Sequence, residues 1–266
     1  MSQPRSRSPR SSDVVAEARS ERGDVVLRRR ATDGALELRV NGVFLMDDRE
    51  TTTERLLART TLDRLADKAA ADATDAADTP GLTGSATDTA GLLIDAPRPA
   101  AGRAGWHVLV GGLGLGFTLA EVLASPRVES AVVAEIEGAI VEWHRAGLVP
   151  GSLLHDERVT VEVADIRDVV RALDLASVDL ILLDVDNGPG FLVYDDNAAV
   201  YGSVFLESCR DALVPGGVLA VWSADHAPDL VEALDSVFGS SLEHALPVTL
   251  GTRHTTYHLF LASRLR

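Results

Sequence analysis

Short apolar runs alternate with segments of helical periodicity from about residue 106 to the end of the chain. The apolar runs fall at 107–112, 130–136, 159–165, 178–185, 216–223, 241–250 and 256–263, and helical patterns fit roughly 117–124, 137–146, 166–172, 197–213 and 226–238. Parallel strands joined by helical crossovers produce this alternation. The last two runs have only a short loop between them, which predicts an antiparallel pair. We therefore expect an α/β, Rossmann-like, doubly wound and mostly parallel seven-stranded sheet with an antiparallel C-terminal strand pair.

The first hundred residues show a different organisation. Apolar and polar residues alternate on both sides of an ATDG turn within Asp24–Val40, which predicts a small N-terminal β-hairpin subdomain, and leucines at helical spacing predict a helix over Thr52–Ala66. The start of the chain is rich in Arg and Ser, and 69–105 is rich in Ala, Asp, Thr, Pro and Gly. The predicted division is a flexible tail (1–23), a hairpin and helix (24–68), a linker or insertion (69–105) and the α/β domain (106–266).

Composition and charge narrow the functional classes. The chain has 266 residues, 46% of them hydrophobic, and a formal net charge of -15 at pH 7. Such a surface repels phosphate backbones, so we expect no nucleic-acid partner. Cys209 is the single cysteine, which excludes an intrachain disulfide and favours a cytoplasmic location. No apolar run reaches the length of a membrane span, and no apolar signal core follows the Arg-rich start, so we expect no membrane partner.

A glycine-rich turn carries the clearest chemical signal. In VLVGGLGLGF, Gly112, Gly114 and Gly116 follow a predicted strand and precede a predicted helix. Glycines allow a tight turn and a close ligand approach, and the helix N-terminus presents free N–H groups. Glu135 ends the next strand at about the 20-residue offset of a ribose-binding acid. The third glycine of the NAD fingerprint is absent, so the pattern favours an S-adenosyl ligand; tight strand–helix packing is the alternative.

Three aspartates follow predicted strands. Asp165 could accept a hydrogen bond from an adenine amino group, or cap the helix that begins at Ile166, or do both. Asp184 and Asp186, at the end of the next strand, are the candidate catalytic acid–base pair. Two carboxylates this close resist joint ionisation unless a cation lies between them, and a substrate ammonium would supply it. The alternative is turn formation, which the sequence Asp-Asn-Gly-Pro also favours.

Two pairs of residues, two histidines and two tyrosines, are further candidates for site residues. His254 and His258 lie four residues apart in a predicted strand, about 13 Å at ~3.3 Å per residue, too far to share one ion, so we expect no metal. Tyr194 and Tyr201 are candidates for the substrate pocket near the carboxyl edge of the sheet, with packing in the core or at an interface as the commoner role of such aromatics.

Several segments together resemble the polyamine aminopropyltransferases, the spermidine synthases, a branch of the class I S-adenosylmethionine-dependent methyltransferase fold. They are GGLGLGFTLAEVLASPRVESAVVAEIE, ERVTVEVADIRD, DLILLDVDNGP, CRDALVPGGVLAVWS and LELRVNGVFLMDDRETTTERLLAR. The resemblance implies transfer of an aminopropyl group from decarboxylated S-adenosylmethionine to a small amine, without a metal, by a homodimer. It also implies that Gly112, Gly114 and Gly116 line the donor loop, Glu135 holds the ribose, Asp165 faces the adenine and Asp184 orients or deprotonates the amine.

Two departures from that family leave alternatives open. Leu115 lies in the glycine loop at the position where the family has an aspartate that binds the ammonium group of the donor. Leu115 is therefore a further candidate pocket residue. Without that aspartate, selection against intact S-adenosylmethionine is weaker. The family's Asp-Ser-Ser-Asp-Pro motif is altered here to Asp184–Pro189. The alternatives are methyl transfer from S-adenosylmethionine to a small molecule, and a non-catalytic homologue that binds an S-adenosyl ligand.

Overall fold

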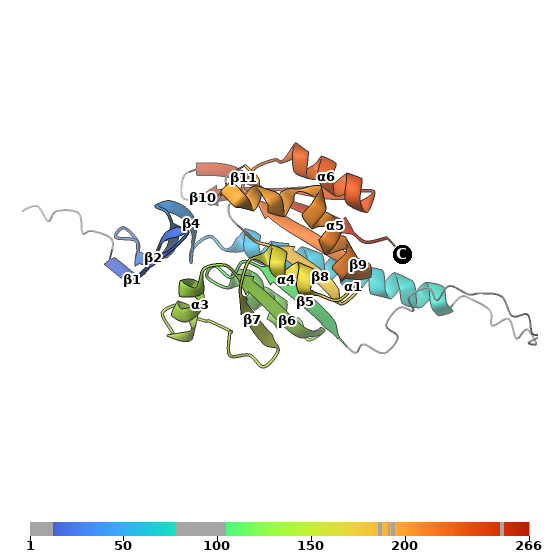
Figure 1. Cartoon of the computed structure of the whole chain (residues 1–266), viewed down its shortest axis with the longest axis horizontal. Helices are drawn as coiled ribbons and strands as arrows, with labels where there is room; N and C mark the ends of the chain where they lie inside the picture. The colour runs from blue at the N-terminus through green and yellow to red at the C-terminus, as the bar shows by residue number, and fades with distance from the viewer. Residues whose placement is uncertain are drawn as a thin grey trace, which may run out of the picture.

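The computed structural model describes residues 13–77, 105–185, 188–190, 192, 195–250 and 253–265. Its larger sheet has the strand order β10-β11-β9-β8-β5-β6-β7 (Figure 1). The strands are β5 (Trp106–Gly111), β6 (Val128–Glu135), β7 (Val159–Val163), β8 (Val178–Leu183), β9 (Leu213–Ser223), β10 (Ser241–Leu250) and β11 (Arg253–Ser263). β5 to β9 pair in parallel, whereas β11 runs antiparallel to β9 and to β10. The predicted mostly parallel seven-stranded sheet with an antiparallel C-terminal pair is confirmed.

Helices cover both faces of this sheet. They are α1 (Thr52–Ala77), α2 (Phe117–Ala124), α3 (Gly138–Arg145), α4 (Ile166–Ala172), α5 (Ser203–Ala212) and α6 (Pro228–Phe238), with a 3₁₀ helix η1 (Asp195–Tyr201). Buried side chains of α1, α2 and α3 form one apolar core with the sheet, and those of η1, α4, α5 and α6 form the second. Both faces are thus covered, which is why the central strands read as continuous apolar runs. No helix among the described residues is long and apolar enough to span a membrane.

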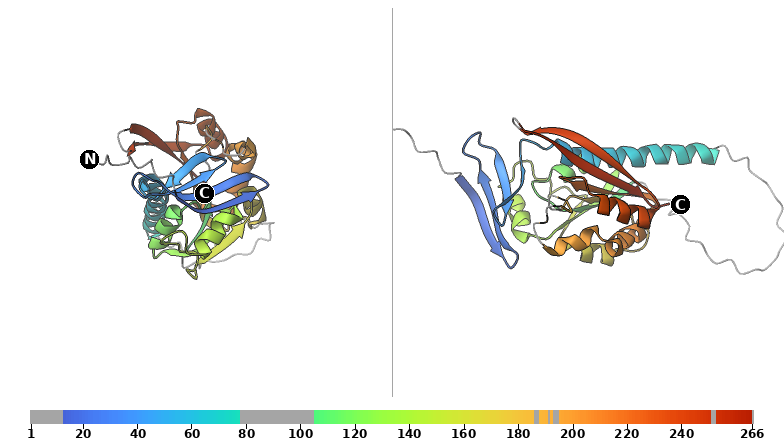
Figure 2. Two further views of the ribbon diagram at one scale, coloured as in Figure 1. Left: turned by 90° about the vertical axis from the view of Figure 1, so that its left-hand side faces the viewer. Right: turned by 90° about the horizontal axis from the view of Figure 1, so that it is seen from above.

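A four-stranded antiparallel sheet precedes α1 in the order β1-β2-β3-β4. Its strands are β1 (Asp13–Ser20), β2 (Gly23–Arg29), β3 (Leu36–Val40) and β4 (Val43–Asp47). Figure 2 shows this small sheet at one end of the seven-stranded sheet, with α1 running from it along the larger sheet. The predicted hairpin corresponds to β2 and β3, so β1 and β4 extend it on either side.

Two predicted boundaries need correction. The flexible tail predicted for 1–23 is wrong from residue 13, because Asp13–Ser20 pairs with β2 as an edge strand. An edge strand that buries little apolar surface has a weak sequence pattern, so backbone pairing rather than burial defines it. The linker predicted for 69–105 is helical up to Ala77, because its alanines extend α1 at little cost once the helix has begun. Residues 1–12 and 78–104 lie outside the described part of the chain.

Helix α1 is held against the α/β domain by its leucines. Leu57, Leu62 and Leu65 are buried and belong to the core that also contains residues of α2 and β9. On the other face of the sheet, Cys209 is fully buried, and burial raises the pKa of its thiol. Cys209 therefore acts as a small apolar core residue.

The packing of α1 is tested by Leu57→Ala. Because Leu57 is 0% exposed, we expect the free energy of unfolding to fall by about 2–5 kcal/mol in chemical denaturation. The same exchange at Leu175, which is 77% exposed, is the control and should change stability by less than about 0.5 kcal/mol. Equal effects of the two substitutions would contradict the docking of α1.

Candidate functional site

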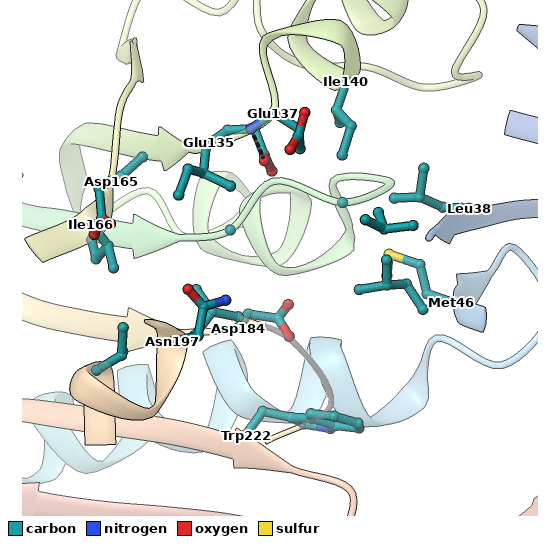
Figure 3. A pocket seen from close by; sticks show the side chains of 18 of the residues that line it. Leu38, Met46, Glu135, Glu137, Ile140, Asp165, Ile166, Asp184, Asn197 and Trp222 are labelled. Carbon is teal, nitrogen blue, oxygen red and sulfur yellow. Dashed lines mark hydrogen bonds between the residues drawn. The ribbon is translucent and has the colours of Figure 1, made fainter. Parts of the chain in front are cut away.

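One cavity brings several of the predicted site residues together at the carboxyl ends of the parallel strands. Its volume, measured out to its open mouth, is about 920 Å³. The glycine loop, the ends of β6, β8 and β9, the N-terminal sheet and α1 all contribute to its wall. Figure 3 shows Glu135, Asp165 and Asp184 gathered around the glycine loop, with Leu38 and Met46 of the N-terminal sheet facing them. Ligands of doubly wound sheets bind at this edge.

The glycine loop approaches its neighbours so closely that side chains would not fit. Gly112 has a φ of 91°, and a Cβ there would lie 2.1 Å from the backbone oxygen of Asp184. Gly114 has a φ of 51°, and its Cβ would lie 2.5 Å from Sδ of Met46. Both glycines line the cavity. Their positive φ angles and tight contacts explain why glycine is required at both positions.

A buried histidine supports the same loop from behind. The Nε2–H of His144 donates to the carbonyl oxygen of Gly114 at 2.9 Å, and its Nδ1 lies 2.9 Å from Oγ of Ser152. Burial lowers the pKa of His144, so the ring is the neutral tautomer that makes both bonds. Gly116 packs on this ring and precedes α2, with a φ of 87°, but it does not line the cavity.

Glu135 is fixed by backbone N–H groups. Its Oε2 accepts from Leu113 at 2.9 Å, and its Oε1 accepts from Glu137 at 2.8 Å, the bond drawn in Figure 3. Burial raises the pKa of Glu135, and these hydrogen bonds act in the opposite direction. A backbone hydrogen bond from Gly114 acts in the same direction as these two. The nearby Glu137 also lines the cavity and accepts from Oγ of Ser20 in β1 at 3.2 Å.

Asp165 caps α4 and also lines the cavity. Its Oδ1 accepts the backbone N–H of Arg167 at 2.8 Å, which confirms the capping role predicted from the sequence. The Arg167 guanidinium also donates to both carboxylate oxygens, and this side-chain hydrogen bonding lowers the pKa of Asp165. The aspartate is therefore an ionised acceptor at the cavity wall, where the adenine contact stays a prediction.

Asp184 and Glu54 form an interacting acidic pair at the cavity wall. Oγ1 of Thr118 donates to Oδ2 of Asp184 at 2.5 Å, and burial raises the pKa of Asp184 to about 6. Glu54, in the first turn of α1, accepts a hydrogen bond from Thr53. Burial, and after it the charge of Asp184, raises the pKa of Glu54 to about 8. Near neutral pH the pair thus carries mainly one negative charge, on Asp184.

Not every predicted pocket residue lines this cavity. Leu115 is wrong as a pocket residue, because its side chain is buried in the apolar core while its N–H contacts Sδ of Met46 at 3.2 Å. Tyr201 does not line the cavity either; its hydroxyl donates to the carbonyl oxygen of Val185 at 2.9 Å and braces the segment after Asp184. The remaining two candidates, Asp186 and Tyr194, lie outside the described residues.

Four residues that line the cavity were not predicted from the sequence. In the sequence, Glu54 resembles any acidic residue that stabilises the first turn of a helix. The residues next to it in the sequence do not indicate that this end of the helix faces a cavity. Glu137 has a possible signal, since it lies two residues after Glu135 at the same strand end. Met46 and Trp222 reach the site through packing between segments far apart in the sequence. The indole Nε1 of Trp222 is buried without a hydrogen-bond partner in the described part of the chain.

The comparisons with known proteins agree with this geometry. The sequence matches the profile of the spermine/spermidine synthase domain over residues 100–233. The spermidine synthase from Thermotoga maritima superimposes with a TM-score of 0.69 at 19% identity, covering 95% of this chain and 73% of that one. This likeness establishes the shared fold, a Rossmann-like domain preceded by a small β-sheet.

Two curated relatives have related names. Polyamine aminopropyltransferase 2 of Pseudomonas aeruginosa is 30% identical over 175 residues, 59% of this chain and 46% of the relative. Putrescine N-methyltransferase 4 of Nicotiana tabacum is 29% identical over 147 residues, 52% of this chain and 36% of the relative. The chain thus spans less than half the length of these two relatives. Because the domain profile covers just over half of the chain, the chain belongs to the spermine/spermidine synthase family.

The burial of Glu54 is tested by the pH dependence of stability. A carboxyl whose folded pKa is about 8 binds its proton more tightly in the folded state, so its contribution is complete below its usual pKa of 4.5 and is lost as pH rises through 8. We expect Glu54→Gln, which cannot ionise, to match the wild-type melting temperature near pH 4.5 and to exceed it above pH 8.

Thermal denaturation across that pH range measures the effect. The same exchange at Glu142, an exposed residue of α3, controls for the substitution itself. A wild-type protein that gains stability relative to Glu54→Gln as the pH rises would show that Glu54 is solvated or paired with a cation in the folded protein.

Proposed function

We propose that this protein transfers an aminopropyl group from decarboxylated S-adenosylmethionine to a small amine. The charge of the cavity carries this proposal. Its wall includes five carboxyl groups, those of Glu54, Glu135, Glu137, Asp165 and Asp184, and none of its described lining residues is Lys, Arg or His. Such a cavity attracts a sulfonium donor and an ammonium acceptor, and it has no basic side chain for the carboxylate of intact S-adenosylmethionine.

The donor fits the glycine loop as the family resemblance implies. Its adenine would lie beside Asp165 and Ile166, and its ribose hydroxyls would donate to the carboxylate of Glu135. The sulfonium would then lie beyond Gly112 and Gly114, toward Asp184 and the N-terminal sheet. The absence of side chains at Gly112 and Gly114 supports this placement, because the backbone there is open to the ligand.

The chemistry needs little covalent help from the protein. The amine nitrogen attacks the propyl carbon bound to sulfur; a C–N bond forms, the C–S bond breaks, and its electron pair stays on the sulfur of methylthioadenosine. The amine proton passes to a carboxylate, for which Asp184 is suited because its pKa of about 6 leaves it mainly ionised at neutral pH. An ammonium between Asp184 and Glu54 would stabilise both in their charged forms.

Methyl transfer is the second candidate, and the names of several curated relatives favour it. The name putrescine N-methyltransferase indicates an amine acceptor, as in the proposal above. It differs from the proposal in the transferred group, which is a methyl group. The two candidates differ in their by-products, methylthioadenosine for aminopropyl transfer and S-adenosylhomocysteine for methyl transfer.

Location and assembly remain predictions within this proposal. A single cysteine fits the reducing cytoplasm, where the small-molecule substrates of such a reaction would be met. The family resemblance implies a homodimer assembled partly through the N-terminal region.

The role of Asp184 is tested by Asp184→Asn. Removing the proton acceptor should lower turnover by about 10²–10⁴-fold, because general-base catalysis contributes this much, while donor binding by calorimetry should change little. Mass spectrometry of the by-product and the modified amine identifies the group transferred. Asp168→Asn, an exchange at an exposed residue of α4, is the control and should retain full turnover.

Three outcomes distinguish aminopropyl transfer, methyl transfer and ligand binding without catalysis. Formation of methylthioadenosine by the wild-type protein, lost in Asp184→Asn, supports the proposal. Formation of S-adenosylhomocysteine would replace it with methyl transfer. Donor binding without either product, over a range of diamines and polyamines, would contradict both and identify a binding protein.

A further inference from the structure

Outside the cavity, three potential metal ligands from three segments meet on one side of the sheet. Oε1 of Glu243 in β10 lies 2.6 Å from Nδ1 of His258 in β11 and 2.7 Å from Nδ1 of His226, which lies between β9 and α6. One ligand atom from each residue lies within 4.8 Å of the other two. None of these three residues lines the cavity, so the cluster is separate from the proposed donor site.

The strand register explains why these residues meet. Glu243 pairs with Phe260 across β10 and β11, and His258 lies two residues before Phe260, on the same face of β11. Diagonal neighbours of this kind are within reach of long side chains. His258 also pairs with Ser223, the last residue of β9, and the chain continues from Ser223 to His226 on that side. Antiparallel pairing of β11 with both neighbours therefore gathers the three side chains.

We infer that His226, Glu243 and His258 bind a zinc ion. Two imidazole nitrogens and one carboxylate oxygen are ligands that Zn²⁺ accepts, and the fourth position would be left for water. Ca²⁺ and Mg²⁺ prefer sites built from oxygen, so two imidazoles argue against both. The convergence of two imidazoles on the same carboxylate oxygen is the observation that distinguishes this cluster from an ordinary surface ion pair.

The present distances require a small adjustment to admit the ion. Tetrahedral bonds of about 2.0–2.1 Å place neighbouring ligand atoms roughly 3.3 Å apart. Each imidazole must therefore move about 0.6–0.7 Å away from the Glu243 oxygen, from the hydrogen-bonded distances of 2.7 and 2.6 Å. His226 is free to move, since its side chain is 59% exposed and it lies in a loop.

The other two ligands are more firmly placed. The His258 side chain is only 12% exposed, and its ring stacks on Phe260 with an interplanar angle of 17° and centroids 6.3 Å apart. Glu243 is fixed by its position in β10. A site with two ordered ligands and one adaptable ligand admits the ion without disturbing the sheet.

Zinc would fasten the loop after β9 to the C-terminal strand pair. Ser223, at the start of this loop, packs against the segment that follows Asp184: a Cβ on Gly188 would lie 2.3 Å from Oγ of Ser223. The ion would therefore stabilise the outer border of the cavity without contacting the donor or the amine. Its role is structural, and it supplies no step in the transfer reaction.

The inference is tested with tag-free full-length protein that has been stripped with a chelator and dialysed. Calorimetric titration with ZnCl₂ should give one ion per chain, and the melting temperature should rise on zinc addition because the ion binds the folded state. Glu243→Gln and His258→Ala should each weaken zinc binding by about tenfold or more and remove the rise in melting temperature.

His254→Ala is the matched control, because His254 lies in the same strand, is exposed and bonds Thr249 instead of Glu243. It should bind zinc as the wild-type protein does. Circular dichroism of the stripped variants establishes that each is folded before titration. No zinc binding by the wild-type protein, or binding unchanged in both ligand variants, would overturn the inference. These results do not depend on the transfer activity, so the two proposals fail separately.

Discussion

The burial of two carboxyl groups against one cavity is the constraint on which the site depends. Asp184 follows the central strand β8, Glu54 begins α1, and the raised pKa of each reflects the free energy required to hold its charge away from water. Only Thr118 donates a side-chain hydrogen bond to Asp184 among the described contacts. A cationic ligand would relieve this electrostatic cost. The buried pair therefore underlies the proposed preference of the cavity for an ammonium group.

The rest of the architecture holds that pair in place. The main chain of Gly112 packs against the backbone of Asp184, which fixes the relation between the glycine loop and the end of β8. The leucines of α1 anchor the helix whose first turn carries Glu54, and the N-terminal sheet closes the cavity with Leu38 and Met46. The small sheet and α1 thus complete a site that the Rossmann-like domain provides only in part.

Much of this arrangement could be predicted from the sequence, because it depends on local patterns. Strands buried on both faces are continuous apolar runs, and Glu135, Asp165 and Asp184 are recognisable because each follows such a run. Glu54 could not be identified, since its burial results from packing between α1 and the domain. Leu115 was misassigned because adjacent positions of a tight loop face different ways. The cluster of His226, Glu243 and His258 depends on antiparallel register across three strands, which no spacing in the sequence encodes.

The central claim is that the cavity binds a cationic S-adenosyl donor and discriminates against the carboxylate of the intact one. The most direct measurement is a calorimetric titration of the purified protein with decarboxylated S-adenosylmethionine, S-adenosylmethionine and methylthioadenosine, side by side. We expect the tightest binding for the decarboxylated donor. Tighter binding of intact S-adenosylmethionine would contradict the electrostatic argument, and no binding of any of the three would contradict the assignment of the cavity as a donor site.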